Sequence, residues 1–344
     1  MTLVNFTMNK LLDKCRIGYR FGKITPDKRY WLCCGPVSSI GSWDEDGTFK
    51  EFWKSQKYQD IRDVLQNDYE MFEEIESCRY CPHYVVEKNW DSYHGDINTN
   101  GSPNQGPKEF QFEVGNPCNH RCDFCWHWSK SLLEIGHPNP DWKEWSKQFI
   151  EWDVFKSIID DLEELGGCKV ISISGGGEPF VLKDMMKMLG YVKSKKFELK
   201  LFTNFSIISN DDIKKLVEME IDQLDINISA GTRETYSDLR GVKPKEWDKL
   251  LERLRYLGEL KSNKTFVKYV NILTKNNIEE VEEIFSISKD VKIDMIDFRV
   301  MTAHPLYDKL IPTENQVNKF VKSVPILSKK YNVNYWNELE YVRS

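Results

Sequence analysis

Stretches of alternating apolar and polar residues recur along the middle of the 344-residue chain. A period of two residues is the pattern of a β-strand that buries one face. The alternation predicts strands at about 109–114, 169–174, 198–203, 222–229, 265–272 and 292–300.

Between these strands, apolar residues recur at helical spacing. The pattern predicts helices at 151–165, 182–196 and 247–257, and the first of them runs into Gly166-Gly167, a suitable C-cap. Strands that alternate with helices are typical of a parallel sheet rolled towards a barrel. Because the pattern gives six units and a closed barrel needs eight, we expect an α/β fold with a partial (β/α)6 barrel.

Changes in composition divide the chain. Residues 91–108 are rich in Gly, Asn, Ser and Pro and predict a linker. The linker separates a cysteine-bearing segment, 1–90, from the barrel, 109–300. The remainder, 301–344, predicts a helix and a short strand that would cap or extend the barrel.

Charge and hydropathy exclude two classes of partner. The formal net charge is −6 and is spread along the chain, which argues against a nucleic-acid-binding surface. No apolar run reaches the length of a membrane span, and the start of the chain lacks the apolar stretch of a signal peptide. We therefore expect a cytoplasmic protein whose nine cysteines serve more as metal ligands than in disulfides.

Three of the cysteines, Cys118, Cys122 and Cys125, follow the first strand of the predicted barrel. Three thiolates on a [4Fe–4S] cluster bind three irons and leave the fourth iron open, whereas four would close it. A zinc site with His120 or His127 as a fourth ligand is the alternative.

Two further motifs follow later strands of the barrel. The second strand runs into Ser-Gly-Gly-Gly-Glu-Pro at 174–179, and the fourth ends at Ser229. Because the carboxyl ends of parallel strands share one face of a barrel, all three motifs should open onto that face.

The spacing Cys-x3-Cys-x2-Cys, followed after the next strand by Gly-Gly-Glu-Pro, resembles the radical S-adenosylmethionine (SAM) superfamily. The resemblance implies a [4Fe–4S] cluster whose open iron binds the amino and carboxylate groups of SAM. It further implies that an electron, from a donor of the flavodoxin or ferredoxin type, cleaves SAM to methionine and a 5′-deoxyadenosyl radical that abstracts a hydrogen atom from the substrate.

The resemblance also implies a set of SAM contacts, while no catalytic side chain is identified. Glycines after the second strand would let backbone groups approach the methionine amino group, and an aromatic ring would lie beside the adenine. Polar residues at strand ends would contact the ribose or carboxylate, although such residues often only cap. The set is Phe124, Gly175, Gly176, Gly177, Glu178, Pro179, Asn204, Ser229 and Arg240.

The N-terminal cysteines resemble a second module, the twitch or SPASM module, which holds an auxiliary [4Fe–4S] cluster. It usually follows the barrel, whereas here it would precede it. A four-cysteine zinc ribbon is the alternative. The implied ligands are Cys15, one of the pair Cys33 and Cys34, Cys78 and Cys81.

These features predict an oxidoreductase-type radical SAM enzyme, with a non-catalytic iron–sulfur carrier as the remote alternative. The chain leads almost directly into cysteines, without an evident peptide-recognition segment, which favours a small-molecule substrate such as a sugar or aminocyclitol. Epimerisation, with a spare thiol of the Cys33/Cys34 pair as hydrogen donor, and modification of a ribosomal peptide stay open.

Overall fold

The computed structural model describes residues 17–33, 39–67, 103–137, 139–301 and 305–339. Its strands form one ten-stranded sheet in the order β10-β9-β8-β7-β6-β5-β4-β1-β2-β3. The strands are β1 (Phe21–Ile24), β2 (Arg29–Trp31), β3 (Ser39–Ser42), β4 (Glu109–Glu113), β5 (Val170–Ser174), β6 (Glu198–Thr203), β7 (Gln223–Asn227), β8 (Phe266–Leu273), β9 (Met295–Val300) and β10 (Asn334–Asn337).

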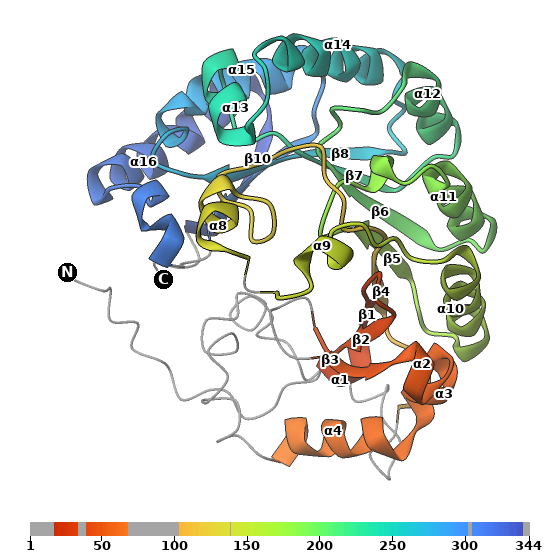
Figure 1. Ribbon diagram of the computed structural model, residues 1–344. Helices are drawn as coiled ribbons and strands as arrows, with labels where there is room; N and C mark the ends of the chain where they lie inside the picture. The colour runs from red at the N-terminus through yellow and green to blue at the C-terminus, as the bar shows by residue number, and fades with distance from the viewer. Residues whose placement is uncertain (1–16, 34–38, 68–102, 138, 302–304, 340–344) are drawn as a thin grey trace.

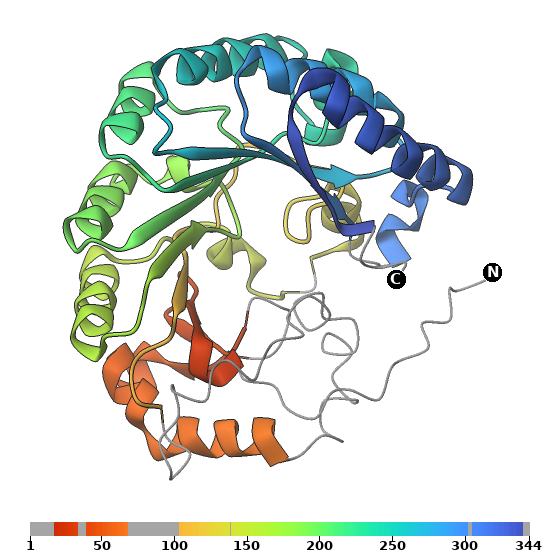
Figure 2. The ribbon, with the colours of Figure 1, turned by 180° about the vertical axis from the view of Figure 1, so that it is seen from behind.

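Strands β4 to β9 are the six that the alternation predicts, and each pairs in parallel with the next. The sheet curves into an arc with the helices on its convex side (Figures 1 and 2). Its two edges are β3 and β10, so the described strands form an open barrel. The prediction of an α/β partial barrel is confirmed.

Most of the helices that follow the barrel strands cover the outside of the arc, whereas the two short helices at 130–135 and 142–145 lie on its inner side (Figure 1). The three predicted helices are confirmed as α10, α11 and α14. The helices of the barrel and C-terminus are α8 (Lys130–Ile135), α9 (Trp142–Trp145), α10 (Trp152–Leu165), η2 (Pro179–Val181), α11 (Met185–Ser194), α12 (Asn210–Glu218), α13 (Arg233–Arg240), α14 (Lys245–Leu260), η3 (Ile278–Glu280), α15 (Val281–Asp290), η4 (Pro305–Leu310) and α16 (Glu314–Tyr331).

Successive residues along β4 point to opposite faces of the sheet. Phe110 and Phe112 are fully buried, and the Phe112 ring lies 4.5 Å from that of Phe155 on α10. The convex face therefore carries the apolar core shared with the helices. Glu109, Gln111 and their neighbours in register face the concave side, which we call the lumen.

The described N-terminal residues belong to the same sheet. Strand β1 pairs in parallel with β4, and β2 and β3 follow as antiparallel strands. Four short helices accompany them: α1 (Ile17–Arg20), α2 (Trp43–Asp46), α3 (Phe49–Lys54) and α4 (Gln56–Asn67). The described part of 1–90 is therefore continuous with the barrel, because its strands extend the barrel's own sheet.

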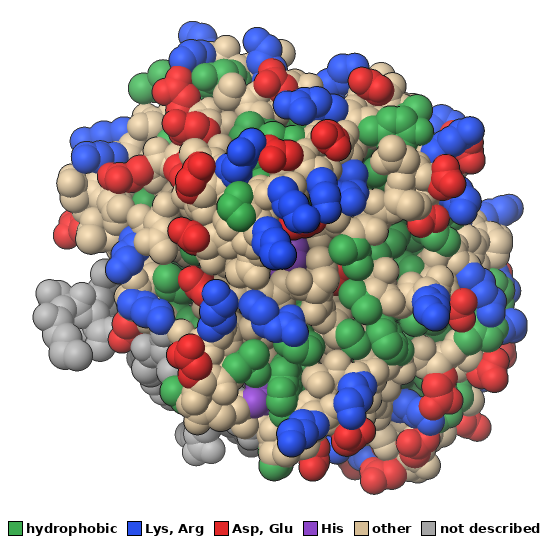
Figure 3. Space-filling model, turned by 45° about the horizontal axis from the view of Figure 1, so that its top comes forward, with side chains coloured by type: hydrophobic (Ala, Val, Ile, Leu, Met, Phe, Trp, Pro, Cys, Tyr) green, Lys and Arg blue, Asp and Glu red, His purple; other side chains and the backbone are tan. Residues whose placement is uncertain are grey.

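The C-terminal residues extend the opposite edge. Strand β10 pairs in parallel with β9, and α16 leads into it through Asn332, a left-handed C-cap with φ 55°. Figure 3 shows acidic and basic side chains interspersed on one face, with several Lys and Arg close together near its centre. None of the described helices is long and apolar enough to cross a membrane.

Candidate active site at the cysteine loop

The loop that carries Cys118, Cys122 and Cys125, here called the cysteine loop, follows β4 and lies at the carboxyl ends of the parallel strands (Figure 1). Backbone hydrogen bonds attach it to the end of α13. The amide of Arg121 donates to the carbonyl of Arg240 at 3.0 Å, and that of Asp123 donates to Leu239 at 2.9 Å. The barrel therefore holds the loop in place from a segment more than a hundred residues away in sequence.

Hydrogen-bond donors surround the three sulfur atoms. The His120 amide donates to Cys118 Sγ at 3.5 Å, and the Trp128 amide donates to Cys125 Sγ at 3.3 Å. Burial raises the pKa of Cys118 to about 12 and that of Cys125 to about 11. Buried thiols of this kind give up their protons to a bound metal, and donors that point at sulfur suit the resulting thiolates.

The disposition of possible ligands fits a cluster better than a zinc ion. In the described ranges, no three His, Cys, Asp or Glu side chains are grouped around a point where one metal ion would bind. A zinc site needs such convergence, whereas the ligands of a cubane cluster bind different irons. The histidines considered for zinc are engaged differently: the His127 ring packs against Trp145 at 4.7 Å, and buried His120 Nδ1 has no hydrogen-bond partner.

The glycine-rich loop after β5 lies directly on the cysteine loop. The Gly177 amide donates to Gly115 O at 3.0 Å, and the Glu178 amide donates to Pro117 O at 2.9 Å. A Cβ atom on Gly177 would lie 2.0 Å from the carbonyl oxygen of Pro117. At this position the sequence needs glycine so that the two backbones can touch.

The carboxylate of Glu178 is buried and accepts its hydrogen bonds from within the protein. Its side chain is 2 % exposed and accepts from Thr203 Oγ1 at 2.6 Å and from the Asn204 amide at 2.7 Å. Burial raises the pKa of Glu178 to about 6. The side chain thus joins the loop after β5 to the end of β6, and Pro179 beside it begins η2.

The structure brings the other SAM-contact candidates to the same region. The side-chain Nδ2 of Asn204 donates to Asn119 Oδ1 of the cysteine loop at 2.9 Å. Fully buried Ser229 donates to Asn227 Oδ1 and accepts from the Ile272 amide, each at 2.9 Å, so its hydroxyl is occupied. Its φ of 53° is a strained conformation for a serine, of the kind that collects at functional sites.

Phe124 and Arg240 pack against each other. The Arg240 guanidinium lies 5.3 Å from the centre of the Phe124 ring, and its Nη1 donates to Cys122 Sγ at 3.3 Å. The residues singled out in the barrel therefore form one connected site. Of the implied auxiliary ligands only Cys33 is described, and it is partly buried; Cys15, Cys34, Cys78 and Cys81 lie outside the described residues.

Sequence reasoning missed two side chains that support this site. Asn227, at the end of β7, accepts from both Arg240 and Ser229, and its polar position at a strand end was a usable signal. Tyr307 donates to Cys125 O at 2.8 Å from a segment 182 residues away, and nothing local in the sequence marks it.

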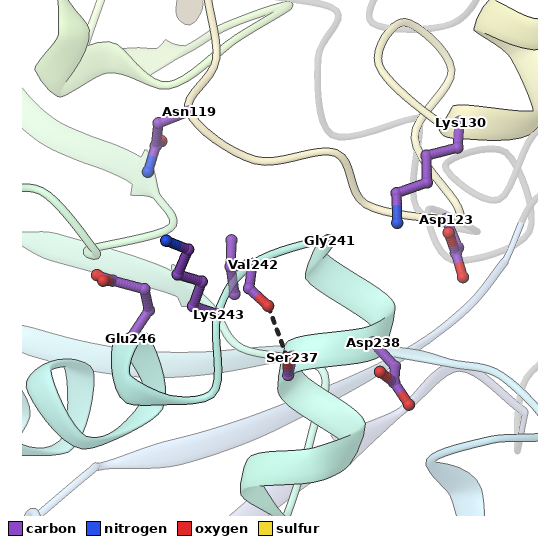
Figure 4. Close-up of a pocket in the computed structure, with 9 residues that line it drawn as sticks. All are labelled: Asn119, Asp123, Lys130, Ser237, Asp238, Gly241, Val242, Lys243 and Glu246. Carbon is purple, nitrogen blue, oxygen red and sulfur yellow. Dashed lines mark hydrogen bonds between the residues drawn. The ribbon is translucent and has the colours of Figure 1, made fainter.

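A hollow of about 710 Å³ lies beside the cysteine loop (Figure 4). Acidic and basic side chains line it together, so it has no dominant charge. Ser237 donates to Val242 O at 2.6 Å within its wall. The lining residues are Asn119, Asp123, Lys130, Ser237, Asp238, Gly241, Val242, Lys243 and Glu246.

Comparison with known protein families identifies the superfamily to which the chain belongs. Residues 112–287, more than half of the chain, match the model of the Radical SAM superfamily. The chain belongs to the radical SAM superfamily. Membership implies a [4Fe–4S] cluster and SAM, for which the cysteine loop supplies suitable donors, and it makes the protein a radical SAM enzyme. The resemblance drawn from the sequence is confirmed, whereas the auxiliary cluster module stays a prediction.

The radical SAM chain is similar to the "Tungsten-containing aldehyde ferredoxin oxidoreductase cofactor-modifying protein" of Pyrococcus furiosus. The two are 26% identical over 239 residues, which cover 66% of this chain and 60% of that protein. The chain therefore spans less than two thirds of the length of that relative.

Solved radical SAM structures share the fold. Streptococcus suis SuiB bound to S-adenosylmethionine matches with a TM-score of 0.53 and 17% identity, over 67% of this chain and 50% of that one. Native anSMEcpe with bound AdoMet matches with a TM-score of 0.54 and 15% identity, over 67% and 64%. At such identities the likeness concerns the fold alone.

Proposed function

We propose that this radical SAM enzyme abstracts a hydrogen atom from a small polar molecule bound in the lumen, and that the net reaction is a two-electron oxidation. A sugar or an aminocyclitol is the class of substrate that we favour. The observation that carries the proposal is the charged and polar lining of the lumen below the cysteine loop.

One group of charges lines the lumen on β7, β8 and β9. Lys268 Nζ lies 3.4 Å from Asp225 and 3.0 Å from Asp297. Arg299 Nη2 lies 2.9 Å from Asp297, and its guanidinium lies 5.6 Å from the centre of the Phe202 ring. The Arg299 side chain is 38% exposed, so it can contact a ligand in the lumen.

A second group lines the lumen on β1, β4, β5 and β6. Lys23 Nζ lies 2.6 Å from Glu113, with both side chains largely buried. Lys200 Nζ lies 3.6 Å from Glu109, and Gln111 donates to Ser174 Oγ at 2.8 Å.

Paired charges on both sides of the lumen favour a polar substrate. The interior of a closed barrel is filled mainly by branched apolar side chains. An apolar ligand would desolvate these ion pairs without offering hydrogen bonds in return. A molecule with several hydroxyl or amino groups can satisfy donors and acceptors of both signs at once.

The cofactors would lie above this lining. Cys118, Cys122 and Cys125 would hold the cluster. SAM would contact the cysteine loop and the strand ends through the residues named for it above, except Arg240, whose guanidinium already makes four hydrogen bonds within the protein. When bound, the cofactors supply a 5′-deoxyadenosyl radical that removes a hydrogen atom from substrate carbon. The chain's own contribution is to orient the substrate against the charged lining and to limit the access of water.

The position of Cys33 supports oxidation as the outcome. Cys33 follows β2, which runs antiparallel to β1, so it lies towards the amino ends of the parallel strands. The length of β4 separates that end from the cysteine loop by about 15 Å. In the cytoplasm, a flavodoxin- or ferredoxin-type donor would reduce the cluster on the cysteine loop for the cleavage of SAM. An oxidised auxiliary cluster held near Cys33 would then accept the electron that remains after the substrate loses a hydrogen atom and a proton.

The first test asks whether the enzyme cleaves SAM. Anaerobically reconstituted protein with SAM and dithionite should form 5′-deoxyadenosine, and Cys118→Ala protein prepared in the same way should not. Equal formation by the two proteins, or none by either, would contradict the proposal.

The second test separates oxidation from its alternatives in deuterated water, with sugars and aminocyclitols that stimulate SAM cleavage. Oxidation yields a product that has lost two hydrogens and carries no deuterium at the reacting carbon. An isomer of unchanged hydrogen count that carries one deuterium would instead show an epimerase. Stimulation by peptides alone would show a peptide-modifying enzyme.

A further inference from the structure

Arg240 is a buried cation at the cysteine loop. It is the last residue of α13 and is 2 % exposed, and Gly241 follows it with φ 62° in a left-handed C-cap. A cation at the carboxyl end of a helix interacts favourably with the helix dipole. The helix and its cap therefore fix where the guanidinium lies.

Four hydrogen bonds hold this guanidinium. Nε donates to Ile228 O at 3.0 Å, and Nη2 donates to Asn227 O at 2.7 Å and to Asn227 Oδ1. Nη1 donates to Cys122 Sγ at 3.3 Å. None of these four hydrogen-bond partners is a carboxylate, although the buried carboxylate of Glu178 interacts electrostatically with Arg240.

A buried guanidinium that is not hydrogen-bonded to a carboxylate is stabilised by negative charge brought close to it, and a cluster bound through the thiolate of Cys122 would supply such charge at the end of the Nη1 hydrogen bond. We propose that Arg240 is a positioning residue that raises the reduction potential of the cluster on the cysteine loop, through its charge and its hydrogen bond to Cys122 Sγ. The inference rests on the cluster that radical SAM membership implies and does not depend on the substrate proposed above.

The physical reason is electrostatic. Reduction adds one electron, supplied by an external one-electron donor such as dithionite, and makes the cluster one unit more negative; no bond at Arg240 forms or breaks. A cation in a low-dielectric site stabilises the reduced form more than the oxidised form. Hydrogen bonds to the ligand sulfur act in the same direction.

This role differs from that of a partner for the carboxylate of SAM. A guanidinium has five N–H donors, of which the protein uses four here. One N–H on Nη1 remains, so the bidentate clamp that arginine usually forms with a carboxylate is unavailable to SAM. The two roles predict different measurements, namely a potential and a SAM dissociation constant.

The test is an EPR redox titration of the reconstituted enzyme without SAM. The EPR signal that is lost in the C118A/C122A/C125A variant is assigned to the cluster on the cysteine loop. If no signal is lost in that variant, the cluster itself is absent from the loop, and this outcome is distinguishable from an effect of Arg240. Arg240→Gln should lower the reduced-to-oxidised ratio at a fixed solution potential about tenfold, which is about 59 mV. Arg240→Lys, which keeps the charge, should restore most of it.

Arg253→Gln is the matched control, because Arg253 on α14 also donates to a backbone carbonyl, that of Ile208, at 2.9 Å. Its potential should equal that of the wild type. Equilibrium dialysis should give Arg240→Gln a SAM dissociation constant within about threefold of the wild type. An unchanged potential together with a large loss of SAM affinity would overturn the proposal in favour of the carboxylate role.

A second variant covers the case in which Arg240→Gln does not fold or bind iron. Asn227→Ala keeps the charge and removes the amide oxygen that accepts from Nη2. Because the guanidinium is held less firmly, the reduced-to-oxidised ratio at a fixed solution potential should fall, but by less than the tenfold expected for Arg240→Gln. An unchanged or raised potential in Asn227→Ala would overturn the proposal.

Discussion

Gly177 lies where the loop after β5 crosses the cysteine loop. A Cβ there would lie 2.0 Å from Pro117 O and 2.4 Å from Asn116 O, both backbone atoms that cannot rotate away. The sequence suggested that these glycines make room for SAM, and the structure adds a reason that needs no cofactor. At Gly177 the glycine allows one loop to support the other.

We predict that Gly177→Ala displaces the cysteine loop, since the clash is with backbone. Reconstituted protein should lose about half of its iron, measured per chain, because only the cluster on the cysteine loop is affected, and it should unfold at a lower temperature. Gly190→Ala is the control: Gly190 lies inside α11, where an added Cβ meets only Met219 Sδ at 3.9 Å. That variant should bind iron normally and gain about 0.5–1 kcal/mol of stability. Normal iron content in Gly177→Ala would contradict the prediction.

Arg62 is a second buried cation, placed among aromatic rings. It is fully buried on α4, its guanidinium lies 4.0 Å from the Tyr58 ring, and it donates to Gly18 O at 3.0 Å and Trp53 O at 2.9 Å. Burial lowers the pKa of Arg62. The side chain fastens α4 to α1 and α3.

We predict that Arg62→Ala lowers the free energy of unfolding by about 3 kcal/mol, because it opens a cavity between the rings and leaves two buried carbonyls without donors. Denaturant titration would measure this. Arg233→Ala, which removes a surface ion pair with Asp248, should change it little. Equal effects of the two substitutions would show that the Arg62 contacts contribute little.

At the scale of elements, α10 caps α3. The helix α3 has a capping box formed by Thr48 and Glu51, and in addition Asp161 of α10 accepts from the Lys50 amide at 2.9 Å. The contact joins an N-terminal helix to a barrel helix 111 residues away. A cap supplied by another element cannot be read from the local sequence of α3.

We predict that Asp161→Ala costs about 1–2 kcal/mol of unfolding free energy and makes the α3–α4 region easier to cleave by protease, because an amide near the start of α3 loses its acceptor. Glu164→Ala is matched to it, since the exposed Glu164 lies on the same helix and pairs with the half-buried Lys50 side chain at 2.6 Å. It should have little effect. If Asp161→Ala and Glu164→Ala had the same unfolding free energy and the same sensitivity to protease, Asp161 would not be acting as a cap of α3.

At the scale of the whole molecule, one sheet connects the N-terminal strands, the barrel and the C-terminal strand. Its convex face is an apolar core, and its concave face carries ion pairs from β1 to β9. The cysteine loop and the glycine-rich loop lie at one end of that lumen. The described part of the molecule thus has an apolar core on the convex face of its sheet and a polar lumen on the concave face.

We predict that the reconstituted enzyme holds two [4Fe–4S] clusters, with about eight iron and eight sulfide per chain. Elemental and sulfide analysis would measure both. The C118A/C122A/C125A variant should keep about half of the iron and only the auxiliary cluster's spectrum. About four iron with zinc present would exclude the second cluster and favour a zinc ribbon.

The sequence alone determined the six barrel strands, three of the barrel helices (α10, α11 and α14) and the position of the three cysteines after the first strand. These features are local, because a strand or helix repeats its polarity with a fixed period over a few residues. The sequence also placed the motifs on one face, since parallel strands end together.

Only the tertiary structure decided how the site is held together. Arg240 contacts Cys122 across 118 residues of chain, Glu178 ties two strand ends, and Ser229 is buried with its hydroxyl occupied. The joining of β1 to β4 across the intervening residues is of the same kind. Such contacts depend on which surfaces meet when the elements pack. The hydrophobic periodicity of one element does not indicate which distant element it will contact.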